Sequence, residues 1–275
     1  MNKLIPLFFG FYFNFIAVFS KKSAAKKAFS LFCSPRAGHV KPEQKSYLDN
    51  AKKEVVTTND INIQVYEWKG AKETILLLHG WESNAFRWRN LIEFLKKENY
   101  NIIAFDAPAH GNSTGNILNV VLYANVTQTL IEKYKPKHII GHSVGGMATL
   151  YNNHLFKNTD IKKLVILGAP SEFKKILANY KEIVGFNNTV LKALKRYIYN
   201  YFGFEAEYFS ISEFAKNFTK KGLLIHDEFD KIAPCTDSEL VHKNWKNSNL
   251  IITQGFGHSL HQEEISNAVI EFLNT

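Results

Sequence analysis

The stretch Gly141-His142-Ser143-Val144-Gly145 decides the fold. An apolar run at 137–141 leads into it, and a helical pattern at 144–156 follows. A Gly-x-Ser-x-Gly motif between a strand and a helix is typical of a sharp turn that leaves the serine hydroxyl exposed at the strand end. The helix that follows would also present backbone N–H groups to developing negative charge. Ser143 is therefore the candidate nucleophile, and Gly141, His142 and Gly145 are supporting residues of the motif.

Outward from this motif, short apolar runs alternate with helical patterns along the chain. Strands are expected at 74–78, 101–105, 137–141, 162–167, 223–226 and 249–253, and helices at 85–97, 120–134, 144–156, 238–245 and 260–273. This alternation predicts βαβ units and an α/β fold with a mostly parallel, doubly wound sheet. Upstream, 54–58 and 61–68 alternate in the β sense around a hairpin turn at Asn59-Asp60.

The rhythm breaks between 171 and 217, where no strand pattern occurs. Helical spacing is seen at 173–183, at 190–201 and in a shorter stretch at 211–218. Because this region lies between two strand–helix units, we predict an inserted helical cap. Its many Phe, Tyr, Leu and Ile residues either pack the cap onto the core or also line an acyl pocket, and both interpretations stay open.

A nucleophilic serine needs a base and an acid that orients the base. His258 lies in a Gly-rich loop between the last strand and the last helix, at the sheet edge expected for Ser143. His261, one helical turn further on, is the reserve candidate. Asp230 follows the strand that ends at His226, and we predict it as the acid. Asp227 and Glu228 compete with it, but the loop must leave the strand before it can reach the base.

Together these segments resemble the α/β-hydrolase-fold serine hydrolases, in particular the esterase, lysophospholipase and monoacylglycerol-lipase-like group. The order Ser143, Asp230, His258 is the order expected for that fold, and the resemblance covers roughly residues 52–275. Three further segments support it: His79-Gly80-Trp81, Asp106 to Ser113, and the His226-x-x-x-Asp230-x-x-x-Pro234 run. Two departures are Ala109 and Asp227, which stand where many members have glycine.

The resemblance implies that the backbone N–H groups of Trp81 and Val144 form an oxyanion hole. The Trp81 side chain would either lie at the pocket mouth or simply pack. His79, His110, His142 and His226 are expected to bond loop backbones near the site, with His79 and Gly80 supporting the oxyanion loop. No histidine has metal-ligand spacing, so neither a metal nor a cofactor is expected.

The first 32 residues are unusual. Residues 4–20 carry no charge and are rich in Phe and Tyr, and Lys21, Lys22, Lys26 and Lys27 follow. Seventeen residues are a marginal span, since about twenty are needed to cross a bilayer. A cleaved signal peptide is disfavoured by the lysines. A membrane anchor with a cytoplasmic basic flank, an interfacial helix, and a helix packed on the protein itself all remain open.

The predicted organisation is thus a hydrophobic and basic N-terminal segment at 1–32, a linker at 33–51, and an α/β-hydrolase domain at 52–275 with its cap at about 171–217. The net charge is +9, yet only four of the 34 basic residues are arginine. Nucleic-acid recognition relies on arginine forks, so no nucleic-acid partner is expected. The two cysteines, Cys33 and Cys235, are read as free thiols, which fits a reducing cytoplasmic compartment, with the inner face of the membrane as a docking place.

The expected function is hydrolysis of carboxylic esters, small or lipid-like, through an acyl-enzyme on Ser143. Thioester hydrolysis or acyl transfer on the same triad is the alternative among enzymes, because the pocket chooses the acceptor. A non-catalytic binding protein on the same fold is the alternative outside enzymes, and its expected mark is a lost triad residue. No triad residue is lost in this sequence.

Overall fold

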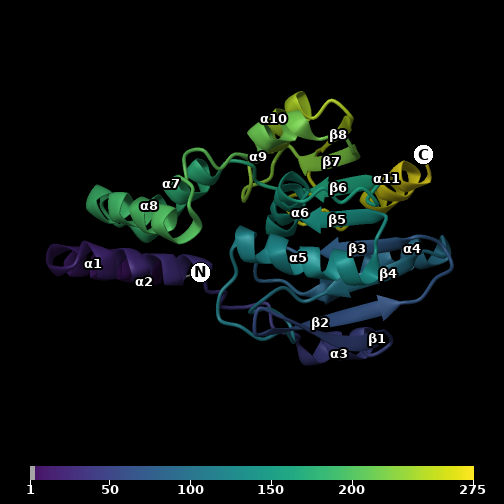
Figure 1. Ribbon diagram of the computed structural model, residues 1–275, viewed down its shortest axis with the longest axis horizontal. Coiled ribbons are helices and arrows are strands. Elements are labelled where there is room, and N and C mark those ends of the chain that lie inside the picture. The colour runs from purple at the N-terminus through teal and green to yellow at the C-terminus, as the bar shows by residue number, and fades with distance from the viewer. Residues whose placement is uncertain (1–3) are drawn as a thin grey trace. The chain divides into compact units, whose positions relative to one another are not determined.

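The computed structural model describes residues 4–275 and divides into two compact units. The sheet unit comprises residues 35–171 and 211–275, and the helical unit comprises residues 1–34 and 172–210. The sheet unit contains one eight-stranded sheet in the order β1-β2-β4-β3-β5-β6-β7-β8 (Figure 1). Its strands are β1 Lys52–Thr58, β2 Ile61–Trp68, β3 Thr74–Leu78, β4 Asn101–Phe105, β5 His138–His142, β6 Lys163–Leu167, β7 Lys221–Asp227 and β8 Ser248–Thr253.

The sheet is mostly parallel, as predicted. Strand β2 pairs antiparallel with both β1 and β4, and every other neighbouring pair is parallel. The expected hairpin joins β1 to β2. Its turn residues Asn59 and Asp60 have φ values of 49° and 58°, and these left-handed conformations match the twist of a two-residue hairpin. The carboxyl ends of β3, β5, β6, β7 and β8 therefore meet at one edge of the sheet.

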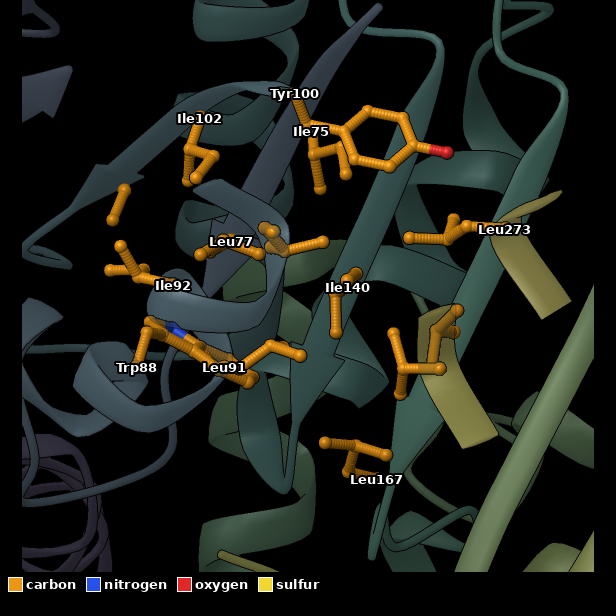
Figure 2. Packing of buried hydrophobic residues seen from close by; sticks show 14 of the residues in the cluster. Ile75, Leu77, Trp88, Leu91, Ile92, Tyr100, Ile102, Ile140, Leu167 and Leu273 are labelled. Carbon is orange, nitrogen blue, oxygen red and sulfur yellow. The ribbon is translucent and has the colours of Figure 1, made fainter. Parts of the chain in front are cut away.

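Helices cover both faces of this sheet. They are α3 Pro42–Leu48, α4 Arg89–Lys97, α5 Val120–Tyr134, α6 Val144–Leu155, α9 Ile211–Phe214, α10 Cys235–Asn244 and α11 Glu263–Asn274, with short 3-10 turns at Ala85–Trp88 and Ala215–Asn217. Figure 2 shows the core on the face that α4 and α11 cover, where Ile75, Leu77 and Ile140 meet Leu91 and Leu273. Neighbouring strand residues that point to the opposite face are also fully buried. The near-continuous apolar strands follow from this two-sided burial.

The helical unit consists of α1 Leu4–Phe19, α2 Lys21–Cys33, α7 Phe173–Val184 and α8 Asn188–Phe202 (Figure 1). Ala24, Ala25 and Ala28 are buried on α2, and small side chains let a helix approach its neighbour α8 closely. Phe29 fills the remaining space against Tyr197, Tyr201 and Phe202 of α8. Segments far apart in sequence thus share one aromatic core.

This grouping differs from the predicted division into an N-terminal segment, a linker and a domain with its cap. The N-terminal helices form one unit with the two long helices of the expected cap. Residues 211–217 belong instead to the sheet unit, where Ile211 and Ala215 are buried. The stretch predicted as a linker contains helix α3. No helix within residues 4–275 is long and apolar enough to cross a bilayer.

Candidate active site

Ser143 lies in the sharp turn between β5 and α6. Its backbone has φ 53° and ψ −124°, a conformation that a residue with a side chain rarely adopts and that costs of order 1–3 kcal/mol. The turn is held by the amide of Ser143, which donates to the carbonyl of Leu167 on β6 at 2.9 Å. The surrounding sheet thereby keeps the serine hydroxyl at the carboxyl end of β5.

The glycines of the motif are required by crowding. A Cβ on Gly145 would lie 2.4 Å from the carbonyl oxygen of Leu78, and one on Gly141 would lie 2.6 Å from the carbonyl oxygen of Gly145. Both distances are too short for any real Cβ contact. Helix α6 can therefore begin directly against the end of β3 only because these positions carry no side chain.

His258 and Asp230 lie beside Ser143 at the carboxyl edge of the sheet. The Nε2 atom of His258 is 3.0 Å from Ser143 Oγ, and its Nδ1 is 2.7 Å from Asp230 Oδ2. A carboxylate only accepts hydrogen bonds, so Nδ1–H donates to Asp230 and Nε2 is free to accept the serine proton. The predicted nucleophile, base and orienting acid therefore lie within hydrogen-bond reach of one another, as such a set requires.

The Asp230 side chain is fully buried yet well supplied with donors. His226 Nε2 lies 3.2 Å from Oδ2, and the amides of Ile232 and Ala233 donate to Oδ1 at 2.8 and 3.1 Å. Burial raises the pKa of Asp230, but the hydrogen bonds from His226, His258 and the two amides outweigh it and hold the pKa well below the usual range. Asp230 therefore stays ionised beside His258.

Asp227, the alternative candidate for the acid, has different hydrogen-bond partners. Its Oδ1 accepts from the amide of Phe229 at 3.0 Å, and its Oδ2 accepts from the Thr253 hydroxyl at 2.9 Å and from the amide of Phe256 at 2.8 Å. These bonds tie the end of β7 to the loop that carries His258. Asp227 thus braces the loop that carries His258, and it makes no hydrogen bond to His258 itself within the described chain.

His142 also supports the loop of His258. Its Nε2 donates to the carbonyl of His258 at 2.8 Å, and its Nδ1 has no hydrogen-bond partner among the described residues. Burial, with nearby Arg87 and His258, lowers its pKa well below the usual value, so the ring is neutral. The expected role of His142 in bonding a loop backbone has a concrete form here, because the loop that it holds is that of His258.

Arg87 was missed by the sequence reasoning. It is buried, and its Nη2 donates to the carbonyl of Ser259 at 2.8 Å while Nη1 lies 3.3 Å from His261 Nε2. His261 is thus a partner of Arg87, and it makes no hydrogen bond to Ser143 in the part of the chain that the structure describes. The Arg87 side chain thus holds the loop directly after His258 against the 3-10 turn Ala85–Trp88, which precedes α4. The available signal was the rarity of arginine in a lysine-rich chain.

The segment His79-Gly80-Trp81 follows β3 at the same edge of the sheet. His79 accepts from the amide of Ala107 at 2.9 Å and donates to the carbonyl of Gly80 at 2.7 Å, and burial lowers its pKa to about 3. A Cβ on Gly80 would lie 2.7 Å from His142 Nδ1. Within residues 4–275 the amides of Trp81 and Val144 donate to no protein acceptor, so both remain available to a ligand oxygen.

The loop after β4 contains one of the two departures from the family pattern. Ala109 has φ 63°, a left-handed conformation in which glycine is favoured. His110 supports the loop by accepting from the amide of Glu82 at 3.0 Å. Asp106 accepts from the amides of Ala85 and Asn112 at 2.8 Å each. This segment thereby anchors the 82–85 stretch that follows Trp81.

Trp81 itself is about one-third exposed, and its ring meets His110 edge-on.

No group of three or more His, Cys, Asp or Glu side chains is placed to hold a metal ion among the residues that the structure describes.

The sheet order and the serine turn between β5 and α6 define a protein of the α/β-hydrolase class. The model of the alpha/beta hydrolase family matches residues 75–231, more than half of the chain, and the chain belongs to this family. It is 24% identical to the uncharacterized hydrolase YugF of Bacillus subtilis, over 79% of this chain and 96% of that protein. It is 31% identical to bovine monoacylglycerol lipase ABHD6, but over only 31% of this chain and 27% of that protein.

Among solved structures, an esterase from Exiguobacterium antarcticum superposes with a TM-score of 0.65 at 15% identity, over 82% of this chain and all of that chain. This likeness establishes the fold. The family match and the curated relatives identify the protein as an esterase- or lipase-like hydrolase.

Proposed function

We propose that this protein hydrolyses carboxylic esters through an acyl-enzyme formed on Ser143. The observation that carries the proposal is the chain of two hydrogen bonds from Ser143 Oγ through His258 to Asp230, at 3.0 and 2.7 Å. The fold itself has no structural need for this chain of hydrogen bonds at a strained serine in a glycine-lined turn. Its chemistry is that of an activated nucleophile.

In the first half of the proposed reaction, Ser143 Oγ attacks the ester carbonyl carbon while His258 Nε2 takes the hydroxyl proton. The carbonyl oxygen becomes an oxyanion and accepts from the amides of Trp81 and Val144. When the C–O bond to the leaving group breaks, His258 returns the proton to the departing alcohol and the acyl group remains on Ser143. Ionised Asp230 stabilises the imidazolium in between.

In the second half, water takes the place of the alcohol. His258 removes a proton from the water as its oxygen attacks the acyl carbon, and the same two amides hold the second oxyanion. The bond to Ser143 Oγ then breaks, and His258 gives the proton back to the serine. The products are a carboxylic acid and the free enzyme, and each proton is returned within the cycle.

We propose lipid-like acyl esters as the substrate class. Part of the chain is similar to a monoacylglycerol lipase, and the first 32 residues are apolar and basic. We also propose the cytoplasm as the compartment, with association to the inner face of the membrane through residues 1–32. Cys33 and Cys235 are free thiols, which is compatible with a reducing environment.

The test is labelling with a fluorophosphonate probe followed by intact-mass measurement. We expect one adduct on the natural protein and none on Ser143→Ala, with Ser46→Ala, at an exposed position of helix α3, as the matched control. Hydrolysis of a p-nitrophenyl ester should fall at least about 10³-fold in Ser143→Ala and stay unchanged in the control. A folded natural protein that forms no adduct, with or without detergent, would contradict the proposal and favour a non-catalytic binding protein.

A further inference from the structure

Helix α1 has two faces of different character. Pro6, Gly10, Phe13 and Ala17 are buried, and they recur every three or four residues along one side. Leu4, Phe8, Phe11, Phe15, Val18 and Phe19 recur with the same period on the other side, and each of them is 58–79% exposed. Large apolar side chains are thus displayed along the whole length of the helix. A contiguous exposed row of this kind marks an interaction surface.

The buried face of α1 already has its partner within the helical unit. A Cβ on Gly10 would lie 1.9 Å from the carbonyl oxygen of Val184 on α7. Asn14 Oδ1 accepts from the amide of Asn187 at 2.8 Å, just before α8 begins. The ring of Phe13 lies 6.4 Å from that of Phe186. These contacts fix which side of α1 packs against α7 and the start of α8. The exposed aromatic row on the other side remains available to a further binding partner.

The charge of the chain is concentrated in the same unit. The helical unit contains eleven lysine and arginine residues against four acidic ones, so it carries +7 of the chain's +9. Residues 1–34 contain no acidic residue. Lys21, Lys22, Lys26 and Lys27 are exposed on α2, directly after the aromatic row ends. An apolar face beside a lysine cluster is complementary to acyl chains beneath anionic headgroups.

The same observations argue against the other occupants. The sixteen residues of α1 extend about 24 Å, which is less than the roughly 30 Å of a bilayer core, and a spanning α1 would lose its packing on α7. A second copy would bring two units of charge +7 face to face, at a cost in electrostatic repulsion. On an anionic lipid surface, each lysine instead raises the binding affinity of the protein by about fivefold.

We propose that the helical unit docks on an anionic lipid bilayer, with α1 lying in the plane of the interface. The exposed aromatic row enters the boundary between headgroups and acyl chains, and the four lysines of α2 contact lipid phosphates. This inference deepens the membrane association proposed above and does not depend on ester hydrolysis. It names the surface, its orientation and the headgroup charge that it selects.

The first experiment is flotation of the 275-residue chain with vesicles of phosphatidylcholine alone or with about one-third phosphatidylglycerol. We expect binding to the anionic vesicles at least about tenfold stronger, and a marked weakening on raising the salt concentration from about 0.1 to about 0.5 M. Equal binding to both vesicle types would overturn the role of the lysines. No binding to either type would overturn the docking proposal, whereas the fluorophosphonate adduct on Ser143 would be unaffected.

Two matched pairs of variants locate the surface. The triple variant Phe8→Ser, Phe11→Ser and Phe15→Ser should lose at least about tenfold in vesicle affinity, and Val55→Ser with Leu155→Ser and Leu240→Ser on the sheet unit should not. Replacing Lys21, Lys22, Lys26 and Lys27 by Gln should remove the preference for anionic vesicles. The same replacement at Lys69, Lys157, Lys243 and Lys246, on the sheet unit, should preserve it. Equal losses in both members of a pair would overturn the assignment.

The orientation of α1 is tested by measuring how deep its two ends lie in the bilayer. An environment-sensitive fluorophore is attached at Phe8→Cys or at Phe19→Cys in a Cys235→Ser background, since Cys33 is buried. Quenching by lipids that carry bromine at known depths should place both labels equally deep. A spanning helix would separate them by about 16 Å. Light scattering without lipid completes the test, because a dimer that the Phe8, Phe11 and Phe15 triple variant disrupts would assign the row to a second copy.

Discussion

Asp227 and Asp230 show at the scale of single residues how a loop of a few residues separates two roles. Both carboxylates are buried and both accept several hydrogen bonds. Asp230 directs one oxygen at His258, whereas Asp227 directs both oxygens at the protein around it. The first orients the imidazole, and the second keeps the loop in place. Replacing them should therefore damage different properties.

We expect Asp230→Asn to lower kcat/KM for an ester about 10³- to 10⁴-fold, because the amide would no longer favour the tautomer and the charge that His258 needs. Asp227→Asn should lower kcat/KM only about tenfold and destabilise the fold by about 1–3 kcal/mol, since an amide cannot satisfy all three donors. Ester kinetics and urea unfolding of both variants measure the two effects. A larger kinetic loss in Asp227→Asn than in Asp230→Asn would reverse the assignment of the acid.

At the scale of elements, the decisive unit is the turn from β5 into α6. Strand and helix are each predictable from local pattern, but their angle depends on contacts with the end of β3. Gly145 allows the first turn of α6 to lie on the carbonyls of Leu78 and His79, whose oxygens would be 2.4 and 2.5 Å from a Cβ at this position. The geometry of Ser143 thus depends on a neighbouring strand that lies far away in the chain.

Gly145→Ala should shift α6 and misplace Ser143. Overpacking of this kind costs about 1–3 kcal/mol, and a displacement of about 1 Å at the nucleophile can cost about 10²-fold in rate. Fluorophosphonate labelling rate and thermal unfolding report the two effects. Asn153→Ala, on the same helix and away from the turn, should leave both unchanged. Full labelling rate in a stable Gly145→Ala protein would contradict the role assigned to crowding.

At the scale of the whole molecule, burial keeps several histidines neutral in the folded state. Burial lowers the pKa of His79 to about 3 and that of His261 to about 4, and it also lowers the pKa of His110, His138 and His142. The unfolded chain takes up protons at these rings below about pH 6.5, and the folded chain takes them up only at lower pH. The stability that the neutral rings contribute is therefore complete above about pH 6.5 and is lost as pH falls.

We expect the free energy of unfolding to fall between about pH 6.5 and pH 4, by about 1.4 kcal/mol per pH unit for each ring that stays neutral. Asp106 offsets the contribution of about one of these rings to the pH dependence. Burial raises the pKa of Asp106 to about 6, so the folded state binds a proton there at a higher pH than the unfolded chain does. Guanidinium unfolding at pH 7, 6 and 5 measures the slope. In His261→Gln the slope of the free energy of unfolding against pH should be smaller by the contribution of one ring. A free energy of unfolding that is unchanged from pH 7 to 5 in the natural protein would refute this linkage.

Local sequence determined the positions of the strands and helices, the hairpin at Asn59-Asp60 and the serine turn, because hydrophobic period and turn chemistry are properties of neighbouring residues. It also placed Ser143, Asp230 and His258 at one sheet edge, because parallel strands share the direction of their carboxyl ends. It could not separate Asp227 from Asp230 by contact, nor find Arg87, because their partners come from other segments.

Only the tertiary structure decided where the N-terminal helices belong. Residues 4–19 are apolar on nearly every side, so their sequence is compatible with lipid, protein or both. Gly10, Asn14 and Phe13 meet α7 and the start of α8, and this contact divides α1 into a protein face and an exposed face. A largely apolar helix specifies burial but not its partner, because hydrophobic attraction has no direction. The close approach at Gly10 and the hydrogen bond of Asn14 select the neighbour.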